Sequence, residues 1–315
     1  MNADGERISH PLVVGASGFL GSALTARLAR DRLPVIAVDR RPESPSYPSG
    51  VRRVCADALT SDLAHLIDDA GVTVVFQLAG SPTVGSAQLD PVGDLTRNCS
   101  TTVALLEAAA ESSQRPLVVF VSSAAVYGQP TRLPISEATP TAPISAYGFS
   151  KLAAEQYLRH YAQRRGVRAF AARPFSVYGP GQRKLVVHDL TLRALGGERP
   201  LRVGAPASTI RDFAFVDDVV GALVALARVA PAEGEAYNIC SGRGTTLGEL
   251  AAAIVTLIGS STEISFAETP PGHDPIAWIG DPGRVNALGI SCDTVLEEGL
   301  QATVAWLRAD AEDVR

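Results

Sequence analysis

Short apolar runs alternate along the first 175 residues with segments in which apolar residues recur at helical spacing. The apolar runs predict strands at 11–15, 34–39, 73–80, 116–123 and 167–175. The segments between them predict helices at 19–32, 61–71, 94–112 and 147–165. Strands that alternate with helices in this way are typical of a parallel sheet with helices on both faces, so the predicted fold class is doubly wound α/β.

The pattern loosens after residue 175, where proline and glycine become more frequent and the elements become shorter. We therefore expect a second, smaller domain that is partly interleaved with the first. The expected division assigns residues 1–175 and about 212–240 to the larger domain, and residues 176–211 and 241–315 to the smaller one.

Composition and charge narrow the function. The chain has 315 residues, of which 46% are hydrophobic and 19% charged, which is enough for a sizeable core. A net charge of −5 gives no basic surface for nucleic acid, so none is expected as a partner. The longest apolar runs are short, and the first ten residues lack the apolar stretch of a signal peptide, so we expect neither a membrane segment nor export.

Four cysteines, Cys55, Cys99, Cys240 and Cys292, lie far apart in the sequence. Their spacing matches no common metal-binding pattern, and we interpret them as reduced thiols. They predict a cytoplasmic protein without a metal site.

A glycine-rich turn follows the first predicted strand, with Gly15, Gly18 and Gly21 spaced as in phosphate-binding turns. Glycine lets the backbone approach a pyrophosphate closely, and the helix that follows offers free N–H groups and the positive end of its dipole. Because a strand precedes the turn and a helix follows it, the turn predicts a dinucleotide site in a Rossmann-type fold.

An acidic residue, Asp39, ends the second predicted strand, where it can accept hydrogen bonds from an adenosine ribose. A carboxylate there repels a 2′-phosphate and favours NAD over NADP. Arg40 and Arg41 follow directly and are able to bind such a phosphate, which works against that preference. Asp57, after the next strand-like stretch, is either a ligand of the adenine amino group or an ordinary loop acid.

Tyr147 and Lys151 are four residues apart on a predicted helix, so their side chains share one face. A free tyrosine has a pKa of about 10, too high for a base at neutral pH. A nearby ammonium, together with an oxidised nicotinamide ring, would stabilise the phenolate. The alternative is an exposed lysine beside a half-buried tyrosine. Ser123 ends a predicted strand, where it either brings a hydroxyl to this pair or is a simple turn serine.

An ordered set of motifs resembles the extended short-chain dehydrogenase/reductase family of NAD-dependent nucleotide-sugar epimerases and dehydratases, with UDP-sugar 4-epimerases as the closest members. The motifs are Gly15-x-x-Gly18-x-x-Gly21, Asp39, NCSTTVALLEAA (98–109), SSAAVYG (122–128), Tyr147-x-x-x-Lys151, RPFSVYGPGQ (173–182) and RDFAFVDDV (211–219). The resemblance covers about residues 11–290. It implies that Tyr147 is the base, that Lys151 binds the nicotinamide ribose and tunes the tyrosine, and that Ser123 assists.

The same resemblance implies NAD as the cofactor, held by the larger domain, and a nucleotide sugar as the substrate, held by the smaller one. The implied cofactor-binding residues are Gly15, Ser17, Gly18, Phe19, Leu20, Gly21, Asp39, Arg40, Asp57, Ala58, Leu78, Ala79, Gly80, Asn98, Val121, Tyr147, Lys151 and Pro174. The implied substrate-binding residues are Ser81, Ser86, Ser123, Ala124, Ser176, His188 and Arg211. In the family, helices corresponding to 94–112 and 147–165 pair between subunits, which implies a homodimer.

The reaction depends on the residues that follow Ser123. Dehydratases of the family resemble one another in an Asp-Glu pair that supplies the acid and base of elimination, whereas this chain has Ala124 and Ala125. The resemblance therefore implies a 4-epimerase of the UDP-hexose or UDP-hexuronate type that acts through a transient 4-keto intermediate. The alternatives are an NAD(P)H-dependent 4-keto-sugar reductase, a 4,6-dehydratase and a non-catalytic dinucleotide sensor.

Arg211 is the expected diphosphate ligand, because a guanidinium fork suits a pyrophosphate. Three departures from the family pattern bear on the substrate. Ser176 stands where Asn is usual, the segment 270–274 (PPGHD) lacks the arginine of the usual RPGD, and Gln77 replaces a histidine. The first two positions resemble sugar-nucleotide contacts, so they leave open an altered nucleotide donor or an atypical substrate.

Overall fold

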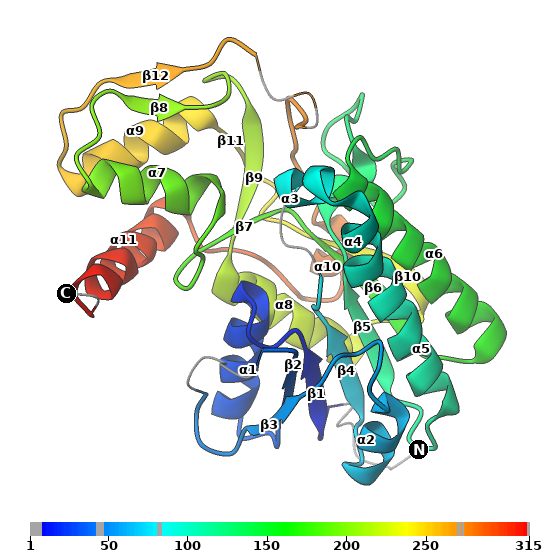
Figure 1. The fold of residues 1–315 in the computed structure, drawn as a ribbon. Coiled ribbons are helices and arrows are strands. Elements are labelled where there is room, and N and C mark those ends of the chain that lie inside the picture. The colour runs from blue at the N-terminus through cyan, green and yellow to red at the C-terminus, as the bar shows by residue number, and fades with distance from the viewer. Residues whose placement is uncertain (1–7, 42–46, 81–83, 270–271, 273, 314–315) are drawn as a thin grey trace.

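Seven parallel strands form the central sheet of the computed structural model, which describes residues 8–41, 47–80, 84–269, 272 and 274–313. The strand order is β10-β6-β5-β4-β1-β2-β3 (Figure 1). The bounds are β1 (Pro11–Val14), β2 (Ile36–Asp39), β3 (Arg52–Cys55), β4 (Val74–Gln77), β5 (Leu117–Val121), β6 (Ala169–Pro174) and β10 (Glu233–Ile239). Every pairing in this sheet is parallel, so the predicted Rossmann-type α/β class is confirmed.

Helices cover both faces of the sheet, because its inner strands are apolar on both sides (Figure 1). Strands β1, β4 and β5 are buried at every position. Helices α1 (Phe19–Arg30) and α8 (Val216–Val229) pack on one face. Helices α2 (Leu63–Asp69), α5 (Thr101–Glu111) and α6 (Ala146–Arg165) pack on the other. The carboxyl ends of the strands thus meet at one edge, where parallel sheets bind ligands.

A smaller group of elements lies beyond that edge (Figure 1). Its helices are α7 (Leu185–Leu195), α9 (Leu247–Ile258) and α11 (Leu296–Asp313). Its strands form the three-stranded sheet β11 (Gly244–Thr246), β9 (Ile210–Phe215) and β7 (Ser176–Tyr178), and the pair β12 (Ile264–Phe266) and β8 (Leu201–Val203). Leu190, Leu250 and Ile254 belong to a separate hydrophobic core in this group. The division of the chain into two domains at the predicted boundaries stays a prediction.

The segment 94–112, expected as one helix, is divided into three pieces. Helix α4 (Pro91–Leu95) begins earlier than expected, because Pro91 suits a first helical turn and Asp90 accepts a hydrogen bond from the backbone of Gly93 at 2.9 Å. A π-helical turn (Thr96–Ser100) follows and leads into α5. Helix α3 (Val84–Leu89) precedes them, and α10 (Gly283–Asn286) lies near the C-terminus. The turn matters for the site, because it turns Asn98 into the interior.

None of the helices in the described part of the chain has the length and hydrophobicity needed to cross a membrane. The described residues also contain no group of three or more His, Cys, Asp or Glu side chains that could hold a metal ion. All four cysteines are free thiols.

Candidate active site

A cavity of about 970 Å³ lies between the carboxyl edge of the central sheet and the smaller group of elements. Residues far apart in the sequence meet on its walls, and most of the predicted site residues are among them. These are Gly15, Gly18, Phe19, Leu20, Gly21, Asp39, Arg40, Asp57, Ala58, Leu78, Ala79, Gly80, Ser86, Val121, Ser123, Tyr147, Lys151, Pro174, Ser176 and Arg211. The cavity is at the upper end of the usual size of ligand sites, roughly 300–1,000 Å³.

Four predicted site residues do not line the cavity. Ser17 is hydrogen-bonded to Asp39, Asn98 is fully buried, and Ala124 is fully buried in a 3₁₀ turn (Ala124–Tyr127). His188 lies half-buried on α7, where burial lowers its pKa. Ser81 lies outside the described residues.

The glycine turn has the close backbone approaches that its spacing predicts. Gly15 has a φ of +84°, and a Cβ there would lie 2.5 Å from the backbone nitrogen of Ala79. A Cβ at Gly21 would overlap the carbonyl oxygen of Gly15. Gly18 precedes the first residue of α1. No described side chain caps the free N–H groups in the first turn of this helix. These N–H groups and the glycine-lined surface fit a pyrophosphate, so the turn fits the dinucleotide predicted from sequence.

Asp39 is held as a carboxylate at the end of β2. Its Oδ2 accepts a hydrogen bond from the backbone of Ser17 at 3.2 Å, and its Oδ1 accepts one from the backbone of Arg41 at 3.0 Å. Burial opposes ionisation, but these hydrogen bonds outweigh it and lower the pKa of Asp39. Arg41 also donates to the hydroxyl of Ser17 at 2.6 Å, so Ser17 joins Asp39 and Arg41 in one hydrogen-bonded group.

The predicted catalytic side chains come together where α6 meets the end of β5. Ser145 caps α6 by accepting a hydrogen bond from Gly148 at 3.2 Å. A Cβ at Gly148 would lie 2.5 Å from the carbonyl oxygen of Ala125, so only glycine lets the helix start this close to the 3₁₀ turn. The hydroxyls of Tyr147 and Ser123 are hydrogen-bonded to each other.

Lys151 lies one helical turn further along α6 and is almost fully buried. Its Nζ donates to the carbonyl oxygen of Val121 at 2.9 Å and lies 5.8 Å from the ring centre of Tyr147. The predicted tyrosine–lysine pair therefore faces one part of the cavity together with Ser123.

Burial dominates the acid–base properties of this group. It raises the pKa of Tyr147 to about 12, although the hydrogen bond with Ser123 acts in the opposite direction and the charge of Asp94 adds to the rise. Burial lowers the pKa of Lys151 to about 8, while Asp94 and Glu155 act against that fall. Without a ligand, the phenol is therefore protonated at neutral pH, and a further positive charge is needed before it can act as a base.

Arg211, on β9, also lines the cavity and is 7% exposed. Its Nη2 lies 2.6 Å from Oδ1 of Asp274, and its guanidinium stacks 5.6 Å from the ring centre of Trp278. The indole of Trp278 is fixed by a 2.9 Å hydrogen bond to the carbonyl of Gly128. Arg211 is thus placed to bind an anion, but its guanidinium is already paired with the carboxylate of Asp274.

The sequence patterns missed several residues at the site. Asp274 and Trp278 line the cavity together with Lys184, which precedes α7. Asp274 belongs to the segment that departs from the family pattern, which was the only sign of it in the sequence. Nothing in the sequence indicated Trp278 or Lys184.

A buried polar network beneath the catalytic group was also missed. Arg173 and Glu155, each 4% exposed at the side chain, form a two-pronged ion pair with distances of 2.6 and 3.0 Å. Ser122 donates to the same carboxylate at 2.5 Å, and Arg173 donates to the hydroxyl of Tyr127 at 2.7 Å. This network joins β6 and α6 to Ser122, the residue between β5 and Ser123.

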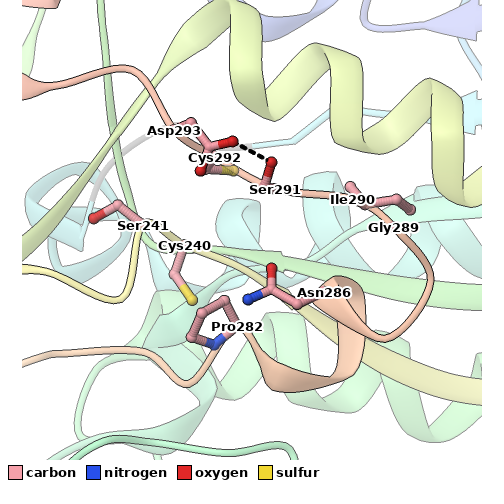
Figure 2. Close-up of a pocket in the computed structure, with 9 residues that line it drawn as sticks. All are labelled: Cys240, Ser241, Pro282, Asn286, Gly289, Ile290, Ser291, Cys292 and Asp293. Carbon is pink, nitrogen blue, oxygen red and sulfur yellow. Dashed lines mark hydrogen bonds between the residues drawn. The ribbon is translucent and has the colours of Figure 1, made fainter.

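A second, smaller cavity of about 330 Å³ lies between the end of β10 and the segment after α10 (Figure 2). Its wall includes two buried thiols, Cys240 and Cys292. Burial raises the pKa of both, that of Cys292 to about 12, so both are protonated and unreactive at neutral pH. Ser291 donates a hydrogen bond to Asp293 on the same wall (Figure 2).

Residues 11–240 match the NAD dependent epimerase/dehydratase family, and the chain belongs to this family. The predicted family and the predicted class, an NAD-dependent epimerase, are thereby confirmed. The chain is 32% identical over 307 residues to the UDP-glucose 4-epimerase of Mycolicibacterium smegmatis, covering 94% of this chain and 98% of that protein. It is 31% identical to the UDP-glucose 4-epimerase of Azospirillum brasilense, covering 96% of this chain and 93% of that one.

Solved structures agree with this assignment. The structure of UDP-glucose 4-epimerase from Thermotoga maritima with UDP-glucose has a TM-score of 0.89 at 27% identity, covering 96% of this chain and 99% of that one. MoeE5 in complex with UDP-glucose and NAD has a TM-score of 0.87 at 32% identity, covering 96% of this chain and 100% of that one.

Proposed function

We propose that the protein is an NAD-dependent UDP-sugar 4-epimerase that works through a transient 4-keto intermediate. The observation that carries this proposal is the meeting of Tyr147, Lys151 and Ser123 on one wall of the cavity. Ala124 and Ala125 follow directly and offer no acid or base for elimination. The relatives from Mycolicibacterium smegmatis and Azospirillum brasilense are both UDP-glucose 4-epimerases, which supports the same reaction.

The glycine turn and the first turn of α1 would hold the pyrophosphate of NAD, and Asp39 would accept hydrogen bonds from its adenosine ribose. Lys151 would hold the nicotinamide ribose, because its ammonium reaches the cavity wall beside Gly80. NAD, when bound, supplies the removal of hydride from C4 of the sugar and its return to the opposite face.

Tyr147 takes the proton of the sugar 4-hydroxyl and later returns it. Its pKa of about 12 in the absence of ligand is too high for this step, so the positive charges of Lys151 and of the oxidised cofactor must act on it together. Ser123 is hydrogen-bonded to the phenol and positions it against the substrate oxygen. General acid–base catalysis of this kind contributes about 10²–10⁴-fold to rate.

Arg211 would bind the diphosphate of the UDP sugar, with Lys184 as a second cation on the wall of the cavity. Lys184 would take the place of the arginine that segment 270–274 lacks. Ser176, which also lines the cavity, would contact the sugar with a hydroxyl where the family usually has an amide.

The test is to incubate the purified protein, without added cofactor, with UDP-, dTDP- and GDP-sugars and to resolve the products by chromatography. The proposal expects a C4 epimer from a UDP sugar and none from Tyr147→Phe. If no donor changes until NADPH and a 4-keto sugar are added, the protein is a reductase and the proposal is wrong.

We also propose a homodimer that forms through α6 and the helices packed beside it. Large apolar side chains are exposed there: Phe149 (61%) and Tyr157 (49%) on α6, and Leu89 (89%) and Val92 (75%) on α3 and α4. Phe149 and Tyr157 are two turns apart, so they share one face. Sedimentation should show a dimer for the native protein and a monomer for Phe149→Glu, and a monomeric native protein would refute the proposal.

We propose the cytoplasm as the location of the protein, because free thiols suit a reducing compartment.

A further inference from the structure

Asp94 is a carboxylate that the proposed reaction leaves without a role, although it is fully buried beside the catalytic helix. It lies on α4, which packs against α6. Its Oδ2 accepts a hydrogen bond from the hydroxyl of Ser150 at 2.6 Å, and its Oδ1 accepts one from Nδ2 of Asn98 at 2.9 Å. Ser150 directly precedes Lys151, so one of the two bonds ends on the catalytic helix itself.

Asn98 carries the second bond toward the cavity wall. Its Nδ2 also donates to the Ser150 hydroxyl at 3.1 Å. Because a carboxylate can only accept hydrogen bonds, Asp94 fixes the amide nitrogen of Asn98 on its own side and turns the amide oxygen away. That oxygen approaches Gly80 so closely that a Cβ there would overlap it, and the same Cβ would lie 3.5 Å from Nζ of Lys151. Asn98, Gly80 and Lys151 therefore meet at one point, and Asp94 sets their arrangement.

The charges around Lys151 single out Asp94 as its countercharge. Two carboxylates act on the Lys151 ammonium, those of Asp94 and Glu155. Glu155 is neutralised by its two-pronged contact with Arg173. Asp94 forms no ion pair among the described residues. Arg97, the cation of the adjoining π-helical turn, is paired with Asp90 instead, with Nη2 3.1 Å from Oδ2.

A buried ammonium and a buried carboxylate are each costly alone, and each lowers the cost of the other. The charge of Asp94 also acts on Tyr147, another titratable residue of α6, and raises its pKa. Helix α3, which also packs beside α6, carries no titratable side chain.

We infer that Asp94 is a positioning residue of this site: it orients Ser150 and Asn98 around Lys151 and supplies the buried countercharge of that side chain. This inference rests on the proposed function only for its kinetic consequence. The electrostatic consequence follows from the fold whether or not the substrate is a UDP sugar.

Asp94→Asn is the direct test, because it removes the charge and keeps the size. The amide can still accept from Asn98 and donate to Ser150, so the hydrogen bonds are retained. Asp94 raises the pKa of both Tyr147 and Lys151, so its loss lowers both. The two limbs of the pH profile of kcat/KM should therefore both move to lower pH, by roughly half to one pH unit.

Two matched variants separate charge from packing. Ser150→Ala removes a hydrogen bond but keeps the carboxylate, so it should lower kcat without moving the limbs. Asp90→Asn removes an exposed, already paired carboxylate four residues away, and should move neither limb. A fall in activity of Asp94→Asn that is uniform across pH would overturn the inference, because it would show a packing role alone.

A second readout needs no substrate. The pKa of Lys151 lies at about 8 in the folded protein and at 10.5 in the reference state, so the unfolded chain binds more protons between these values. The free energy of unfolding of the ligand-free protein should therefore rise with pH above about 8, and in Asp94→Asn the rise should begin at lower pH. Urea titrations across this range measure it, and an unchanged onset would contradict the inference.

The two proposals fail in different ways. If the native protein epimerises no sugar, the proposed function fails while the unfolding titration still tests Asp94. If Asp94→Asn does not fold, Asp94→Glu is the alternative, because it keeps the charge on a longer side chain. A reduced kcat with both limbs of the pH profile at their native positions would support the inference. Displaced limbs would overturn it.

Discussion

Arg211 and Asp274 face each other on the wall of the cavity, with Nη2 2.6 Å from Oδ1. A diphosphate that binds Arg211 must displace this carboxylate. Asp274→Asn should therefore strengthen UDP binding, and since a partly exposed ion pair is worth about 0.2–1 kcal/mol, the gain should be about 1.4- to fivefold. Arg211→Met should weaken binding by at least about tenfold, because charge-assisted hydrogen bonds contribute about 1.5–3 kcal/mol.

Isothermal titration with UDP measures both effects. Asp310→Asn is the matched control, because Asp310 forms an ion pair of the same length, 2.6 Å, with Arg183 away from the cavity. Its UDP affinity should equal that of the native protein. Weaker binding by Asp274→Asn would show that this carboxylate supports the site instead of competing for it.

Lys151 makes the ligand-free protein less stable at neutral pH. The lowering of its pKa from 10.5 to about 8 corresponds to about 3 kcal/mol of burial cost. Lys151→Met removes this cost and loses the hydrogen bond to Val121, worth about 1 kcal/mol, so it should raise the free energy of unfolding by about 2 kcal/mol near pH 7.

The pH dependence gives this prediction its sign. A depressed lysine pKa means that the native protein gains stability as pH rises from about 8 toward 10.5. The advantage of Lys151→Met should therefore shrink over that range. Urea unfolding at two pH values tests it, with the exposed Lys184→Met as control. An advantage that grows with pH would contradict the electrostatic explanation.

The ion pair of Glu155 and Arg173 should be the most sensitive polar contact below the site. Glu155→Gln leaves a buried guanidinium without its countercharge, and should lower the free energy of unfolding by about 3–5 kcal/mol. Asp189→Asn, which breaks an exposed pair with Arg193 on α7, should cost less than about 1 kcal/mol. Thermal or urea unfolding compares the two, and equal losses would refute the prediction.

The fold was predictable because parallel strands buried on both faces leave a continuous apolar signal. Strands β1, β2, β4, β5 and β6 lie within the predicted ranges. The edge strand β3 was weaker in the sequence, because residues 52–55 begin with two arginines and are largely exposed. The π-helical turn was invisible, because one extra residue in a helical turn hardly changes the apolar pattern of a long helix.

The candidate site was predictable to the extent that it is built from local motifs. The glycine turn and the Tyr147–Lys151 pair are defined by spacing within one element. The ion pair between Arg211 and Asp274 joins residues 63 positions apart, and Asp94 meets Ser150 across 56 positions. Contacts of that kind are set by the packing of helices and strands, which no spacing in the sequence encodes.

The central claim is that the reaction is a redox-neutral inversion at C4. The most direct measurement uses the UDP sugar identified by the panel, deuterated at C4, with the native protein and with Tyr147→Phe. The account predicts that the native protein forms the C4 epimer with deuterium retained at C4, and that the variant forms none. A product with solvent hydrogen at C4, or one that forms only with added NADPH, would contradict it.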